Sequence, residues 1–116
     1  MADDRILEET EEQITICIGP AEWVNSAGLF ILEEDFQAGG EIWRVHKYDP
    51  DPYPSNPHAH CVGGRRRFMG CKLHLGTAEL YRDGKPTGRY LWAPHFDQLI
   101  ELIKPKFPHL VLPLTN

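Results

Sequence analysis

Two histidines separated by a single residue, His58 and His60, are the residues whose types and spacing best suit chemistry. In an extended strand, alternate side chains point to the same face, so both imidazoles would lie on one side of a sheet. Imidazole titrates near neutral pH, and two imidazoles can therefore serve as a general base and a general acid. With a nearby cation, such a pair could cleave RNA, which carries its own nucleophile in the 2′-hydroxyl.

The segments after these histidines predict the rest of the site. Residues 71–75 alternate apolar and polar side chains, and Gly76-Thr77 predicts a tight hairpin turn into residues 78–82. A register that pairs 58 with 74 and 60 with 72 keeps the apolar side chains of all three segments in the core. His74 then lies opposite Glu79, and Lys72 lies opposite Tyr81. The polar face of the sheet is therefore expected to carry His58, His60, Lys72, His74, Glu79 and Tyr81, with His58 and His60 both accessible to solvent.

Each of these side chains has an expected role. We predict four catalytic residues, which supply the acid, the base and a cation for the developing phosphorane charge: His58, His60, Lys72 and His74. Five further residues would bind the substrate, three of them in a basic connection at the rim of the site: Arg65, Arg66, Arg67, Glu79 and Tyr81. No cofactor is required by this chemistry.

Other interpretations of the same residues stay open. His-x-His on a strand also suits a metal ion or small ligand, with His46, His74 or Glu79 completing the ligand set. It resembles the metal sites of cupins, although the glutamate that cupins place a few residues later is missing. A non-catalytic interaction module is a third interpretation, with Trp23, Trp43, Trp92 and the proline-rich segment 49–57 as its surface. Ordinary polar residues on a solvated sheet face are the fourth.

The charge pattern is compatible with a polyanionic partner. Residues 1–41 hold eleven of the seventeen carboxylates and one of the twelve basic residues, so residues 42–116 are net basic. A basic side could attract RNA, whereas internal pairing of the two halves would cancel it. The expected partners are therefore RNA or a partner protein, with no membrane.

The elements that must position the site are mostly strands. Strands are predicted at 14–18, 42–48, 58–62, 71–75, 78–82 and 88–92, and residues 29–32 are ambiguous. A helix is predicted from Pro94 to Lys104, because Phe96, Leu99, Ile100 and Ile103 form one apolar stripe. This stripe should cover Trp43, Leu73, Leu80 and Leu91. The expected fold is α+β: an antiparallel β-meander sheet with one main C-terminal helix packed on one face.

Length and composition favour one domain over residues 1–116, with residues 1–12 as an acidic arm or a short helix. The three cysteines are too few and odd in number for a disulfide scaffold, and each is expected to be a small buried residue. The first residues lack the pattern of a signal peptide, and no apolar run is long enough to span a membrane. A reduced, cytoplasmic location is therefore expected.

Residues 42–106 resemble a family of small, uncharacterised bacterial proteins. The resemblance rests on Asn56-Pro-His-Ala-His60, Lys72-Leu-His-Leu75, Gly76-Thr-Ala-Glu-Leu80 and the helix at 94–104. Family members have a Thr-Gly-Glu-Leu turn where this chain has Ala78. The family resembles partners in toxin–antitoxin-like pairs and mobile-element cargo, which implies a nucleic-acid-directed role. The leading interpretation is thus a small bacterial RNA-directed module, with metal-independent acid–base ribonuclease activity as its most specific form.

Overall fold

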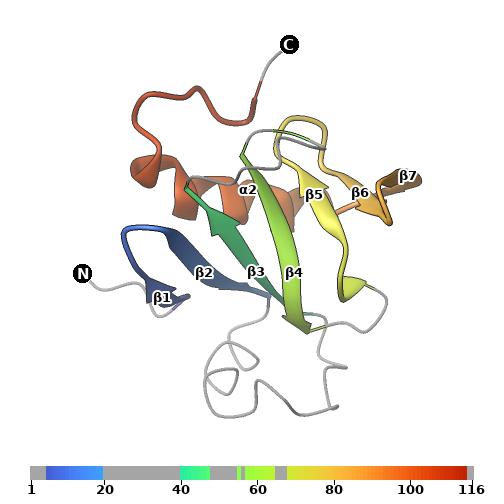
Figure 1. The fold of residues 1–116 in the computed structure, drawn as a ribbon, viewed down its shortest axis with the longest axis horizontal. Coiled ribbons are helices and arrows are strands. Elements are labelled where there is room, and N and C mark those ends of the chain that lie inside the picture. The colour runs from blue at the N-terminus through green and yellow to red at the C-terminus, as the bar shows by residue number, and fades with distance from the viewer. Residues whose placement is uncertain (1–4, 20–39, 48–54, 56, 65–67, 115–116) are drawn as a thin grey trace.

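Seven antiparallel strands form one sheet in which the spatial order of the strands follows their order in the sequence. A computed structural model describes residues 5–19, 40–47, 55, 57–64 and 68–114. The strands are β1 (Ile6–Glu9), β2 (Gln13–Ile18), β3 (Glu41–His46), β4 (His58–Gly64), β5 (Lys72–His74), β6 (Glu79–Arg82) and β7 (Lys85–Tyr90). Helix α2 (Ala93–Ile103) follows and continues into a 3₁₀ turn, Lys104–Lys106. The predicted α+β meander is confirmed (Figure 1).

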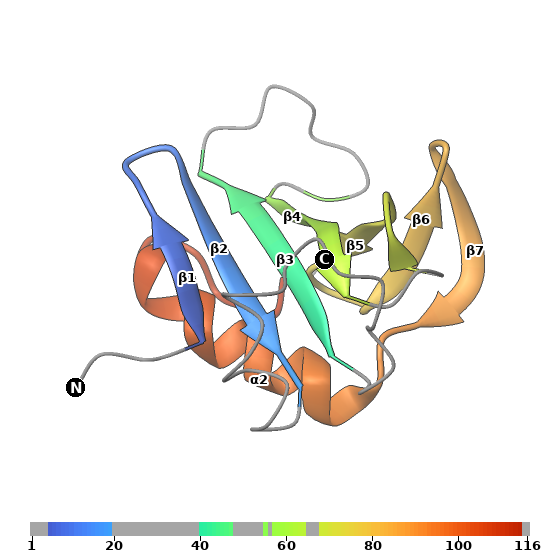
Figure 2. The same cartoon turned by 90° about the horizontal axis from the view of Figure 1, so that it is seen from below.

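The helix covers one face of the sheet, as the spacing of its apolar residues predicts (Figure 2). Leu99 and Ile103 are fully buried, and Phe96 and Ile100 are nearly so. They belong to the same core as the apolar side chains of the strands, which include Trp43, Leu73, Leu80 and Leu91. The predicted core and helix are therefore correct, and Pro94 occupies the first turn, where its missing N–H is harmless. No helix among the described residues is long and apolar enough to span a membrane.

The N-terminal segment differs from the prediction of an acidic arm or short helix. Ile6–Glu9 form strand β1, which pairs with β2 at the edge of the sheet. The acidic composition concealed this, because only Ile6 and Leu7 supply apolar surface. The strand is held by its partners: Glu9 forms ion pairs with Lys106 at 2.9 Å and Lys47 at 3.6 Å. These pairs join the acidic and basic halves of the chain.

The two faces of the sheet differ in composition because side chains alternate along each strand. Ile14, Ile16 and Ile18 of β2 point toward the helix, so Thr15 and Cys17 point to the opposite face. There, Cys17 and Ile42 form a small apolar cluster with Leu7 and Val62. The rest of this second face carries the histidines, and we call it the polar face.

The cysteines are core residues, as predicted. All three carry free thiols and are buried. Burial raises the pKa of the Cys17 and Cys61 thiols to about 12, which keeps both protonated near neutral pH.

Candidate functional site

The predicted strand register is confirmed on the polar face. His58 pairs with His74, His60 pairs with Lys72, and Lys72 in turn pairs with Tyr81. The pairing extends to the other side of β4, where His60 is opposite Arg44, and Arg44 is opposite Thr15. Five adjacent strands therefore contribute one row of polar side chains: Thr15, Arg44, His60, Lys72 and Tyr81. Neighbouring strands are about 4.8 Å apart, so long side chains on adjacent strands, such as those of Arg44, His60 and Lys72, can meet at one ligand.

His60 is the centre of the row. Its ring centroid lies 4.7 Å from that of His58 and 5.4 Å from that of His46. It is half-buried, as are its row neighbours Arg44 and Lys72. An imidazole between a guanidinium and an ammonium group suits an anionic ligand, because both neighbours attract negative charge.

His58 lies on the predicted face, but the expectation that it is solvent-accessible is wrong. Its exposed fraction is 1%. Nδ1 of His58 is 2.8 Å from the carbonyl oxygen of Ser55, which can only accept, so Nδ1 carries the proton. Ser55 is also tied down, since its hydroxyl donates to the Pro57 carbonyl and accepts from the Leu75 N–H. The alternation of side chains along the strand predicted the direction of His58. It did not predict that Ser55, three residues earlier, would accept a hydrogen bond from the His58 ring.

His74 is fixed by its own turn. Its Nδ1 accepts hydrogen bonds from the backbone N–H groups of Gly76 at 2.9 Å and Thr77 at 3.1 Å. Gly76 is required here, because a Cβ atom at this position would lie 2.9 Å from the His74 ring and 2.7 Å from the Leu114 carbonyl oxygen. Burial lowers the pKa of His74, although the Glu79 carboxylate opposes the shift. His74 is therefore a neutral side chain that offers only its Nε2–H, and cannot be the general base through Nδ1.

Two residues of the site had no catalytic role in the sequence analysis. His46 entered it only as a possible metal ligand, and Arg44 was not singled out. Nε of Arg44 donates to the Thr15 hydroxyl at 3.1 Å, which orients the guanidinium group over the sheet. Alternation along β3 places both residues on the polar face and would have identified them.

The remaining predicted site residues lie at the rim of the polar face or outside the described residues. Arg65, Arg66 and Arg67 lie outside the described residues, as do Trp23, residues 29–32 and most of the segment 49–57. Tyr81 stacks on His74 with the ring centroids 6.4 Å apart, and the Glu79 carboxylate accepts a hydrogen bond from the Gly88 N–H. Among the described residues, no three histidine, cysteine or acidic side chains converge in a way that could hold a metal ion.

Comparisons with protein-family models, curated proteins and solved structures give no match for this chain.

Proposed function

We propose that the polar face binds the phosphate backbone of single-stranded RNA and cleaves it by metal-independent acid–base catalysis. The observation that carries the proposal is the position of His60, between Arg44 and Lys72 in register and 5.4 Å from the ring of His46. The two imidazoles supply a base and an acid, and the two cations supply charge for the phosphate.

The reaction is a transesterification that needs no external nucleophile. One imidazole, as general base, takes the proton of the 2′-hydroxyl, and the 2′-oxygen attacks phosphorus. The bond from phosphorus to the 5′-oxygen breaks, and the second imidazole, in its charged form, donates a proton to that leaving oxygen. The products are a 2′,3′-cyclic phosphate and a 5′-hydroxyl. Arg44 and Lys72 stabilise the negative charge on the non-bridging oxygens.

The other predicted catalytic residues take supporting roles in this proposal. His58 is buried with its Nδ1–H directed to Ser55, so it holds the ring of His60 rather than touching substrate. His74 can donate through Nε2–H to a phosphate oxygen. Tyr81 provides an aromatic surface beside Lys72 on which a base could stack.

Replacement of His60 tests the proposal. His60→Ala and His46→Ala should each lower the cleavage of a fluorogenic RNA oligonucleotide by about 100-fold or more, the usual effect of losing a general acid or base. His109→Ala is the matched control, because His109 is exposed and distant in sequence from the strands, and it should cleave like the wild type. A 2′-O-methyl oligonucleotide lacks the nucleophile and should remain intact with every variant.

Three outcomes would contradict the proposal. These are full activity of His60→Ala, equal cleavage of the 2′-O-methyl oligonucleotide, and no cleavage or binding of RNA by the wild type. Elemental analysis of the purified protein distinguishes the metal interpretation from this proposal. Stoichiometric zinc, nickel or iron that is present in the wild type and lost in His60→Ala would indicate a metal site instead.

A further inference from the structure

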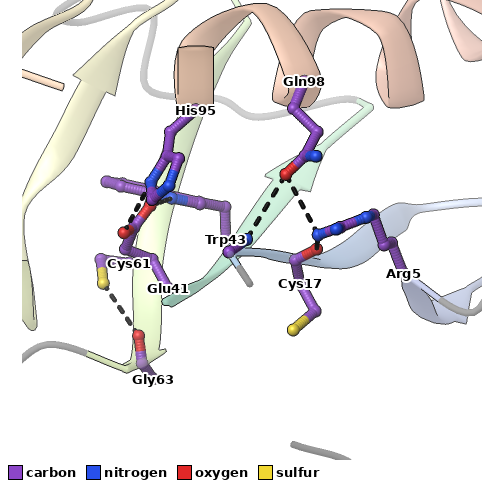
Figure 3. A network of polar contacts seen from close by, with 9 residues as sticks. Arg5, Cys17, Glu41, Trp43, Cys61, Gly63, His95 and Gln98 are labelled. Carbon is purple, nitrogen blue, oxygen red and sulfur yellow. Dashed lines mark hydrogen bonds and ion pairs between the residues drawn. The ribbon is translucent and has the colours of Figure 1, made fainter. Parts of the chain in front are cut away.

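A buried carboxylate–imidazole pair lies on the helix side of the sheet, away from the polar face (Figure 3). Glu41, the first residue of β3, has an exposed fraction of 0%. Nδ1 of His95, in the first turn of α2, is 3.0 Å from one carboxylate oxygen and 3.2 Å from the other. The indole N–H of Trp43 donates to the same carboxylate at 3.4 Å. A buried carboxylate needs such donors, because burial without them is costly.

The pair fixes the tautomer of His95. An ionised carboxylate only accepts hydrogen bonds, so in the neutral form of His95 the proton is on Nδ1 and a lone pair is on Nε2. A carboxylate on one ring nitrogen also makes the other nitrogen a stronger acceptor. Within the described part of the chain, Nε2 of His95 makes no hydrogen bond, and it is not fully buried although the residue is only 9% exposed. An acceptor without a protein donor is thus held in place where a ligand can reach it.

An exposed aromatic ring lies beside the His95 ring. Trp92, immediately before α2, has an exposed fraction of 65%. Its ring centroid is 5.0 Å from that of His95, with the two planes inclined at 69°. An exposed indole offers a large flat apolar surface on which planar rings stack.

We propose that His95 and Trp92 form a second site, which binds a nucleobase with a ring N–H, such as guanine or uracil. The base stacks on the indole of Trp92, and its lactam N–H donates to Nε2 of His95. Glu41 is a positioning residue that holds the imidazole in the required tautomer. Adenine and cytosine lack a ring N–H at the corresponding position and would lose this hydrogen bond.

The nearby thiol does not make this a covalent site. Sγ of Cys61 donates to the Gly63 carbonyl at 3.2 Å. Its pKa of about 12, raised mainly by burial, leaves it protonated. The site is therefore assigned to binding of a nucleobase and not to a covalent reaction. The proposal does not require that the polar face cleaves RNA.

Titration of the full chain with nucleoside monophosphates tests this site. GMP and UMP should bind about three- to tenfold more tightly than AMP and CMP, the usual range for one net hydrogen bond. Ribose 5-phosphate, which has no base, should not bind at this site. In the NMR spectrum, the Nε2 resonance of His95 should shift on addition of GMP. A guanine-containing dinucleotide, compared with GMP, shows whether the base is taken from a free nucleotide or from a strand.

Matched variants separate stacking from a structural role. Trp92→Ala should weaken GMP binding by about tenfold, because stacking on one aromatic side chain typically contributes this much or more. Tyr90→Ala removes a nearby exposed aromatic ring and should change binding less than twofold. Since Trp92 is exposed, Trp92→Ala should fold. The test therefore does not need a replacement of the buried His95, which could unfold the protein. Equal binding of GMP and ribose 5-phosphate, an unmoved His95 resonance, or equal effects of the two variants would overturn the proposal.

Discussion

At the scale of single residues, the imidazoles of the polar face differ in the hydrogen bonds that fix them. His58 donates through Nδ1 to a carbonyl group, whereas His74 accepts through Nδ1 from two backbone N–H groups. The two partners in register thus hold opposite tautomers when neutral. Their residue type and spacing alone could not distinguish these states, because the partners come from the surrounding backbone.

The burial of His74 predicts a pH dependence of stability. Its pKa is lowered in the folded protein, so near and below the ordinary value of about 6.5 the unfolded chain binds more protons at this position. The contribution of neutral His74 is therefore complete above pH 6.5 and is lost as the pH falls below it. His74→Asn keeps an acceptor for the turn but does not titrate. Urea unfolding at pH 7.5 and 5.5 should show a smaller loss for His74→Asn than for the wild type, and an equal loss would contradict this assignment.

Sequence reasoning predicted the direction of the site residues better than their exposure. Alternation along β4 and β5, with apolar residues kept inside, was sufficient for the register of His60 with Lys72. The burial of His58 depends on Ser55 and Pro57, which the sequence presents only as part of a proline-rich connection. The Glu41–His95 pair was missed because its members are 54 residues apart and neither belongs to a motif.

At the scale of elements, apolar periodicity determined what could be predicted. The helix was predicted correctly because its stripe has a 3.6-residue period, and most strands were found because they alternate or are continuously apolar. Strand β1 was missed because its stability comes from pairing and from the contacts of Glu9, which no local pattern reveals.

The helix stripe gives a direct stability prediction. Leu99 is fully buried in the core, so Leu99→Ala should lower the free energy of unfolding by about 2–5 kcal/mol through lost burial and the cavity left behind. Val111→Ala is a suitable control, because Val111 is 74% exposed and its loss should cost no more than about 0.5 kcal/mol. Chemical denaturation of both variants measures the difference. Similar values for the two would mean that α2 does not cover the core.

At the scale of the whole molecule, the net charge of −5 conceals a local arrangement that suits an anion. The acidic and basic halves are partly paired with one another, as Glu9 shows with Lys47 and Lys106. The row on the polar face nevertheless combines Arg44 and Lys72 with the imidazole of His60. The charge balance of the two halves left a basic side and internal pairing both open, because it contains no information on placement.

The proposed binding of RNA by this row should depend on salt. If Lys72 contacts a phosphate, its replacement in Lys72→Met should reduce the slope of log Kd against log salt concentration by about 0.7, the value for one contact with a single strand. Lys104→Met removes an exposed charge near the end of α2 and should leave the slope unchanged. Fluorescence anisotropy over a salt series measures both. A slope near zero for the wild type would show that phosphate contacts do not drive binding.

Strand β7, at one edge of the sheet, has a consequence for how this protein meets another chain. All six of its residues are exposed, and within the described residues it pairs on one side only, with β6. An open edge of this kind is a template for further strand pairing, which proteins resist by placing proline and positive charge along it. β7 carries Lys85, Pro86 and Arg89. Unwanted edge-to-edge aggregation is thereby discouraged, while an extended acidic segment with complementary charge would still find unpaired backbone groups to join.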